Sequence, residues 1–204
     1  MKRTKEEASI TREQLLSKAL KVFSKKGYAA ATLEDIAREA EVTRGAIYWH
    51  FGSKAELYNA LIREYSSRGL EIMQQAAAEG GALSEILRRV FVRQLQAVEK
   101  DTALRALMEL QLFKTGLVAE LEEGRKQQIE AGAGLIEMLA GIMGQGAQAG
   151  LLRSDVPPKE MALAYLAFQN GLIHLWLTSS NQFSLKDSAD SFADILMAGL
   201  QNQQ

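Results

Sequence analysis

The fold of this chain is decided by the stretch Thr43-Arg44-Gly45-Ala46-Ile47-Tyr48-Trp49-His50-Phe51, which is followed directly by Gly52-Ser53-Lys54-Ala55-Glu56-Leu57. Thr43 predicts the start of a short helix, because its side chain can accept a hydrogen bond from a free backbone N–H. Gly52 predicts the end of that helix, since glycine readily adopts the left-handed conformation of a helix terminus. Ser53 and Glu56 form a Ser-x-x-Glu capping box, so a second helix is expected to begin at Ser53.

The short helix has two different faces. Ile47 and Phe51 lie one turn apart and predict a buried face. Arg44, Gly45 and Tyr48 then lie on the opposite side, where they are free to meet a partner. A short capped helix with an arginine and a glycine on its first turn, and aromatic side chains beyond, is suited to the major groove of DNA. The stretch therefore predicts a protein that reads duplex DNA.

The preceding residues predict a longer first helix. Thr11-Arg12-Glu13-Gln14 has the capping-box pattern, and Gly27 is the expected end of the helix. Apolar residues recur between them at helical spacing, namely Leu15, Leu16, Ala19, Leu20 and Phe23. The residues from Met1 to Glu7 carry charges with no apolar core after them, so we expect a mobile basic arm rather than a secretory signal.

A helix-turn-helix is the expected arrangement between these two helices. Thr32 predicts another helix start, and Asp35 can close its cap. Leu33, Ile36, Ala37 and Ala40 form the apolar stripe of this helix. The short turn at Glu41-Val42 then leads to Thr43, and two helices joined so closely cross steeply, which presents the second one outward.

Charge divides the chain in the same way. Residues 1 to 54 hold eleven Lys and Arg against seven Asp and Glu, whereas the formal net charge of the whole chain is −1. A near-neutral protein with one basic end indicates local contact with phosphates rather than general coating of a polyanion. The chain has no cysteine and only two histidines. We therefore expect no metal and no cofactor, and the composition is compatible with a reducing cytoplasm.

The rest of the chain predicts an all-α body. Alanine and leucine dominate, the only prolines are Pro157 and Pro158, and no alternating strand pattern occurs. Helices are expected near 53–78, 83–99, 102–113, 116–150, 158–180 and 187–201, with breaks at Gly80-Gly81 and at 150–158. We expect an N-terminal arm and helix-turn-helix domain over residues 1–52 and a larger effector-binding and dimerisation domain over 53–204.

The helix after Pro158 is apolar on two faces, which predicts burial on both sides. No charged residue lies between Met161 and Leu185. Gln169, Asn170 and His174 argue against a membrane span. A central helix with its own domain on one side and a partner subunit on the other fits better, so we expect a homodimer through the helices near 158–180 and 187–201.

Three motifs resemble the TetR family of repressors, in particular its drug-efflux branch typified by AcrR and TtgR. They are Thr32-Leu33-x-x-Ile36-Ala37, the run Val42–Phe51, and Lys54-x-x-Leu57. The match is specific over residues 10 to 60, and Asn170-Gly171-Leu172-Ile173-x-x-Trp176-Leu177 resembles that branch further along. The resemblance implies an all-helical homodimer that binds a palindromic operator, is released by a small, largely apolar effector, and controls a multidrug efflux pump.

The resemblance also implies roles for single residues. Phosphate contacts are implied for Thr32, Thr43, Tyr48, His50 and Lys54, and base-edge contacts for Arg44 and Gly45, with Tyr48 and Trp49 as further candidates. Physical chemistry agrees, because hydroxyls, an imidazole and an amine at helix starts suit phosphate, and arginine is the usual bidentate partner of guanine. Glu41 departs from the family, where the turn more often holds a small residue. We expect either strain in the turn or a weaker approach of phosphate, with the helix itself intact.

Two of these residues could instead serve the fold alone. Trp49 could anchor the core of the head, because large aromatic side chains usually serve cores. His50 could cap its own helix by meeting late carbonyls. Arg44 is harder to account for without DNA once the whole motif is considered.

The effector site is less clear from the sequence. Polar residues within apolar helices suit an apolar pocket with few orienting groups. The candidates are Tyr65, Ser66, Glu109, Leu166, Gln169, Asn170, Ile173 and His174. His174 could equally be a hydrogen-bonded core or interface histidine, and Glu109 could simply be solvated.

Rival classes fit less well. Gly144-x-Gly146 lacks the spacing of a dinucleotide loop, no Gly-x-Ser-x-Gly elbow occurs, and His50 and His174 sit on different predicted units, so we expect no enzyme. A ligand-independent DNA-bending protein should be smaller and more basic. A TetR-like regulator of a metabolic pathway remains an alternative to control of efflux.

Overall fold

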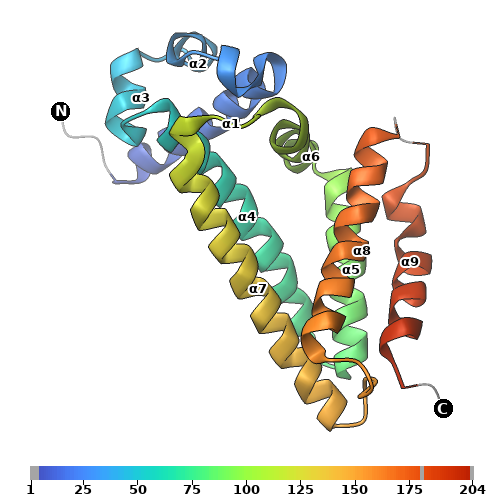
Figure 1. Ribbon diagram of the computed structural model, residues 1–204. Coiled ribbons are helices and arrows are strands. Elements are labelled where there is room, and N and C mark those ends of the chain that lie inside the picture. The colour runs from blue at the N-terminus through green and yellow to red at the C-terminus, as the bar shows by residue number, and fades with distance from the viewer. Residues whose placement is uncertain (1–4, 180–181, 203–204) are drawn as a thin grey trace. The chain divides into compact units, whose positions relative to one another are not determined.

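The computed structural model describes residues 5–179 and 182–202, and all regular structure in these ranges is helical (Figure 1). The expectation of an all-α fold is confirmed. The α-helices are α1 Lys5–Ala30, α2 Leu33–Ala40, α3 Arg44–Phe51, α4 Lys54–Ala78, α5 Leu83–Lys100, α6 Thr102–Glu109, α7 Glu122–Gln148, α8 Pro158–Thr178 and α9 Leu185–Leu200. A π-helical turn, Leu110–Lys114, follows α6, and a 3-10 turn, Ala119–Leu121, precedes α7.

The helices pack into two compact units. Unit 1 takes residues 1–68 and 102–125, and unit 2 takes residues 69–101 and 126–204. Unit 1 is therefore built from two separate stretches of chain, and α4 and α7 each run from one unit into the other. The boundary expected between residues 52 and 53 concerns a division of function and stays a prediction.

The core of unit 1 joins the helix-turn-helix to the second stretch of chain. Leu107, Leu110 and Leu121 belong to the same buried cluster as the apolar residues of α1 to α4. An aromatic group lies within it, because the Tyr28 ring stacks on Phe23 at 5.6 Å and meets Tyr58 edge-on at 5.0 Å between centroids. Burial of rings of this size contributes strongly to a small core.

The start of α1 differs from the prediction. The helix begins at Lys5 and not at Thr11, so the expected arm is helical from Lys5 onward, and residues 1–4 lie outside the described part of the chain. Residues 5–10 contain no glycine or proline, so nothing prevents the helix from continuing past the capping pattern at Thr11. The predicted break at Gly27 is confirmed, with φ at 75° and ψ at 163°. Lys114 Nζ donates to the Ser24 carbonyl at 2.7 Å, which satisfies a carbonyl near this break.

The helix predicted from residue 116 begins later, at Glu122. Gly116 has φ at 68°, and Val118 is extended, with φ at −114° and ψ at 124°. These two conformations are incompatible with a continuous helix, which explains the shorter α7.

Unit 2 centres on α5, α8 and α9, which lie side by side (Figure 1). Phe91 of α5 stacks on Phe168 of α8 at 5.9 Å between centroids, and the Tyr165 hydroxyl donates to the Leu87 carbonyl at 2.9 Å. Arg88 pairs with Asp194 of α9 at 2.9 Å. The three helices are thus held by apolar packing and by an ion pair at its edge.

Helix α8 is buried on one side within this chain and exposed on the other. Its buried residues are Met161, Ala162, Tyr165, Gln169, Leu172, Ile173 and Trp176. On the other side Leu163 and Leu175 are 44% and 57% exposed, so burial on both sides does not occur within the single chain. None of the helices in the described ranges is long and apolar enough to cross a membrane.

Candidate nucleic-acid interface

The turn between α2 and α3 forms as the sequence predicts. Glu41 adopts the left-handed conformation with φ at 56°, and Val42 donates its backbone N–H to the Ala37 carbonyl at 3.0 Å. Thr43 caps α3 by accepting a hydrogen bond from the Ala46 N–H at 3.2 Å. Glu41 is the only residue other than glycine with positive φ in the described ranges. This conformation costs any residue with a Cβ about 1 kcal/mol, so the turn is strained at Glu41, but a small residue other than glycine would carry the same strain.

Helix α3 buries one face and exposes the other. Ile47 is fully buried and Phe51 is 8% exposed, as expected. On the opposite side Tyr48 is 43% exposed and Trp49 is 75% exposed. Trp49 therefore lies outside the core, and its interpretation as a core anchor is wrong. Its ring meets the His50 ring edge-on at 4.6 Å, and His50 also lies 6.0 Å from the Phe51 ring.

Arg44 is ordered by its neighbour one turn along. Its Nη2 donates to the Tyr48 hydroxyl at 2.8 Å, and its Cζ lies 5.2 Å from the centre of the Tyr48 ring. The bond to Tyr48 raises the pKa of Arg44 above its usual value, and a guanidinium is charged in proteins in any case. Holding an exposed arginine in one orientation lowers the entropy that it would lose on binding a partner.

Packing within the protein does not require glycine at position 45. A Cβ built there would meet only Thr43 Oγ1, at 3.7 Å, which is ordinary van der Waals distance. The residue lies on the first turn of α3 and is exposed. A bare position on an exposed helix start lets an outside partner approach the backbone closely.

Thr32 and Thr43 differ in what they can offer a phosphate. The Thr32 hydroxyl donates to Asp35 Oδ2 at 2.8 Å and accepts from the Asp35 N–H at 3.1 Å, so it is committed to the capping box. Hydrogen bonds from Lys26 and from Thr32 lower the pKa of Asp35 to about 2. The Thr43 hydroxyl only accepts a bond in its cap, and its proton remains available. Of the two threonines, Thr43 is thus the better phosphate donor.

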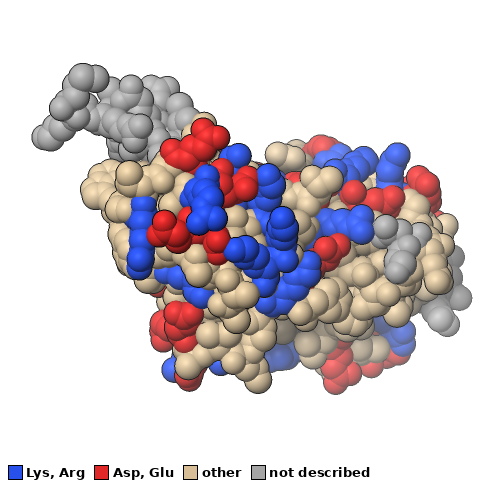
Figure 2. All heavy atoms as spheres, turned by 90° about the horizontal axis from the view of Figure 1, so that it is seen from above, with Lys and Arg blue, Asp and Glu red and all other residues tan. Residues whose placement is uncertain are grey.

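Part of the positive charge of residues 1–54 is neutralised inside unit 1. Lys18 and Lys21 pair with Glu39 at 3.8 and 2.7 Å, and Lys26 pairs with Asp35 at 2.6 Å. Figure 2 shows the same mixture on the face seen from above, where Lys and Arg atoms lie among Asp and Glu atoms. If this unit is the DNA-binding surface that the sequence predicts, contact would depend on a few positioned cations rather than on one continuous basic patch.

Lys54 is positioned by the protein itself. Its Nζ donates to the carbonyls of Tyr28 and Ala31, both at 3.2 Å, and lies 4.3 Å from the centre of the Tyr28 ring. It also lies 3.7 Å from Glu120 Oε1. The lysine thus holds the end of the α1 segment to the start of α4 and presents a positive charge at a fixed point.

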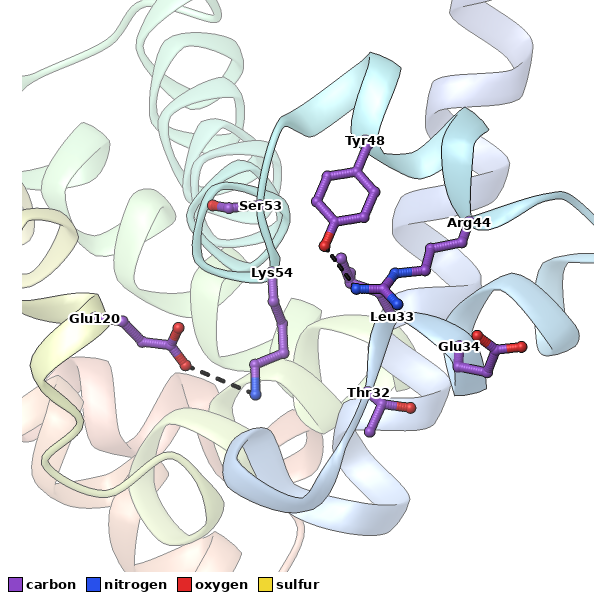
Figure 3. A pocket seen from close by; sticks show the side chains of 8 residues that line it. All are labelled: Thr32, Leu33, Glu34, Arg44, Tyr48, Ser53, Lys54 and Glu120. Atoms are coloured by element: carbon purple, nitrogen blue, oxygen red, sulfur yellow. Dashed lines mark hydrogen bonds and ion pairs between the residues drawn. The ribbon is translucent and has the colours of Figure 1, made fainter.

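Arg44, Tyr48 and Lys54 surround one hollow of about 550 Å³ (Figure 3). It is lined by Thr32, Leu33, Glu34, Arg44, Tyr48, Ser53, Lys54 and Glu120. The Ser53 hydroxyl accepts a bond from the Glu56 N–H at 3.0 Å, which confirms the Ser53 half of the predicted capping box. The structure therefore brings four of the predicted DNA-binding residues, Thr32, Arg44, Tyr48 and Lys54, to one concave surface. Glu34 and Glu120 were not predicted.

Comparison with known proteins identifies the family. Residues 15–61 match the family described as bacterial regulatory proteins, tetR family, and residues 83–202 match the C-terminal region of the MAATS-type transcriptional repressors. The chain belongs to the TetR family.

Relatives cover nearly the whole of this TetR-family chain. The HTH-type transcriptional regulator AcrR of Shigella flexneri is 31% identical over 198 residues, which is 96% of this chain and 92% of that protein. Among solved structures, SmeT in complex with triclosan is 26% identical with a TM-score of 0.78, covering 95% of this chain and 93% of SmeT. NalD, the secondary repressor of the MexAB-OprM multidrug efflux pump in Pseudomonas aeruginosa, has the same fold, with a TM-score of 0.85 at 24% identity and coverage of 98% and 100%.

The candidate effector residues of this TetR protein fall into both units. In unit 1, Tyr65 of α4 is buried under Arg68, whose Cζ lies 4.4 Å from its ring centre, while Ser66 is exposed. Glu109 of α6 pairs with Arg105 at 3.0 Å and is therefore not simply solvated. These residues stay candidates for effector binding.

The other five effector candidates lie on α8 in unit 2. Gln169 is buried and donates to Gln94 of α5, Ile173 is buried, and Leu166 is half-buried. Asn170 and His174 lie on the exposed side of the helix. The five candidates therefore do not form a single face of the helix. Asn170 and His174, on the exposed side, are as well placed for contact with a partner subunit as for contact with a small molecule.

Proposed function

We propose that this TetR-family protein is a ligand-responsive transcriptional repressor of the cytoplasm. It binds a palindromic operator as a homodimer, a small and largely apolar effector releases it, and it controls a multidrug efflux pump. It performs no catalysis. The likeness to AcrR over nearly the full chain, to NalD in fold, and to SmeT, which was solved with triclosan, supports this proposal.

The exposed face of α3 carries the proposal. Arg44, Tyr48 and Trp49 are exposed, and Gly45 leaves the backbone bare on the same first turn as Arg44. Two neighbouring exposed aromatic side chains form an apolar surface that a partner could cover. An arginine already held in one orientation loses less entropy when it binds. The major groove of DNA accepts a helix of this kind, with arginine on a guanine edge and the aromatic side chains on the phosphates or bases.

The dimer is proposed from the exposed side of α8 and the adjacent α9. Leu163 and Leu175 of α8 and Ile195 of α9 are exposed by 44%, 57% and 64%. Small residues such as Ala167 and Gly171 lie between them on α8 and allow close approach of a second helix pair. A paired copy of this surface would form the four-helix interface expected of a symmetric dimer.

Release by the effector follows from the spacing of the two heads. Two α3 helices must lie about 34 to 36 Å apart to enter successive major grooves on one face of the duplex. Helix α4 begins directly after the α3 turn and continues into unit 2, so it is the natural lever between effector and head. A differential affinity of about 1 to 3 kcal/mol gives graded release, and about 5.5 kcal/mol gives a nearly complete switch.

The test uses Gly45→Ala, with Gly141→Ala of α7 as the matched control. A Cβ at Gly141, as at Gly45, meets no atom of the protein closer than van der Waals distance, so both variants are expected to fold. Gel-shift titrations with an operator selected from random duplexes should show weaker binding for Gly45→Ala only. Equal affinity of both variants would remove α3 from the interface.

The effector is tested on the same DNA complex. Triclosan, the ligand of the SmeT complex, and a series of apolar drugs are added at increasing concentration. We expect them to release the duplex. Long-chain acyl-CoA, the class of ligand solved with the Bacillus subtilis transcriptional regulator FadR, should not release it. Release by acyl-CoA alone would favour the alternative function, regulation of a metabolic pathway. If none of these compounds releases the duplex, the proposed response to an apolar effector is wrong.

A further inference from the structure

Glu120 places a negative charge in the hollow where the proposed DNA contacts meet. It lies on the 3-10 turn before α7, far along the chain from the helix-turn-helix, yet its carboxylate points toward Lys54 (Figure 3). The same carboxylate lies beside the buried Tyr28 hydroxyl, and burial together with Glu120 raises the pKa of that tyrosine. An acidic side chain is the least expected neighbour for a phosphate-binding lysine.

Lys54 has few N–H donors left for a phosphate. An ammonium group has three N–H donors, and two of these go to the carbonyls of Tyr28 and Ala31. One donor remains. Glu120 Oε1 lies 3.7 Å from Lys54 Nζ, which is an ion-pair distance but too long for a normal hydrogen bond. A phosphate oxygen arriving at Lys54 would need the same donor.

The two partners of this ion pair differ in freedom. The Lys54 side chain is 20% exposed and is fixed by the two carbonyls and the Tyr28 ring, whereas the Glu120 side chain is 50% exposed. The carboxylate can therefore turn away into solvent while the ammonium stays in place. An ion pair at 3.7 Å whose carboxylate is half-exposed is weak, so a phosphate held by further contacts can displace the carboxylate.

We infer that Glu120 is an internal competitor for the DNA phosphate that Lys54 binds. Its carboxylate lies at ion-pair distance from Lys54 Nζ in the free protein and repels the phosphate in the complex, which lowers affinity for operator and for random duplex alike. Phosphate contacts carry no sequence information, so this residue sets the strength of binding and not its specificity. The inference rests on the proposed function, because it requires that the α3 face binds DNA.

The experiment compares Glu120→Gln with Glu123→Gln in the full-length protein. Glu123 is exposed on the first turn of α7, outside the residues that line the hollow, and its change removes the same charge. Glu120→Gln should bind operator and random duplex about three- to tenfold more tightly at low salt, and Glu123→Gln should change affinity much less. The plot of log K against log salt should become steeper for Glu120→Gln by up to about 0.9.

A double-mutant cycle assigns the effect to Lys54. In a Lys54→Gln background the change Glu120→Gln should no longer raise affinity beyond the gain of Glu123→Gln. If Glu120→Gln binds like Glu123→Gln, or more weakly than the unchanged protein, the inference is wrong. If the unchanged protein selects no duplex at all, the proposed function fails instead, so the two failures are distinguishable.

Discussion

Gly124→Ala tests the packing of α7 against α4 within unit 1. A Cβ at Gly124 would lie 2.6 Å from Cγ and 2.7 Å from Nδ2 of Asn59 on α4. Both distances are far below van der Waals contact, and Asn59 is only 7% exposed, so its amide has little room to turn aside. The Oδ1 atom of Asn59 has no hydrogen-bond partner in the described part of the chain. The two helices therefore approach closely because this position of α7 has no side chain.

The magnitude follows from two opposing effects. Alanine in place of glycine in a helix stabilises by about 0.5 to 1 kcal/mol. Forcing an extra methyl group into a packed site costs about 1 to 3 kcal/mol. We expect Gly124→Ala to lower the free energy of unfolding by about 0.5 to 2 kcal/mol. In an Asn59→Ala background the clash is absent, and Gly124→Ala should raise the free energy of unfolding by about 0.5 to 1 kcal/mol.

Urea denaturation at one fixed protein concentration measures this cycle, because the proposed dimer would make apparent stability depend on concentration. The coupling energy between Gly124 and Asn59 should be about 1 to 3 kcal/mol. If Gly124→Ala has the same effect in both backgrounds, within about 0.5 kcal/mol, then the close approach of the two helices does not restrict this position.

Two further predictions concern the cap of α2 and the dimer. The pKa of Asp35 is lowered to about 2, so this carboxylate stabilises the fold above about pH 4 and the stabilisation disappears as pH falls toward 2. The difference in urea midpoint between the protein and Asp35→Asn should therefore shrink over that range, and a constant difference would contradict it. Leu175→Glu should give monomers in sedimentation velocity at micromolar concentration, whereas Leu117→Glu, at a residue 90% exposed in unit 1, should not. A dimer that persists with Leu175→Glu would exclude this face of α8.

The sequence predicts the parts of the fold that depend on near neighbours. Thr32, Thr43 and Ser53 each cap a helix with a donor three residues away, so their roles can be predicted from local spacing. The start of α1 was predicted wrongly, because a capping pattern at Thr11 does not stop a helix whose earlier residues also favour it.

Long-range features were beyond local spacing. Glu120 meets Lys54 only because the chain returns to unit 1 after α5, and no pattern near either residue indicates this. Polar residues within an apolar helix are similarly ambiguous. Gln169 and Asn170 are neighbours in the sequence, yet one is buried against Gln94 and the other is exposed. Periodicity predicts which residues share a face, but it does not predict what covers that face.

The construction of unit 1 from two stretches of chain limits how DNA-binding specificity can be exchanged among relatives. Leu107, Leu110 and Leu121 fill the same core as α1 to α4, and Lys114 holds the end of α1. A chimera that transplants only the first 68 residues would leave behind Leu107, Leu110 and Leu121 and so disrupt the core. A transplant that also keeps residues 102–125 carries the whole core and should retain a folded reading head.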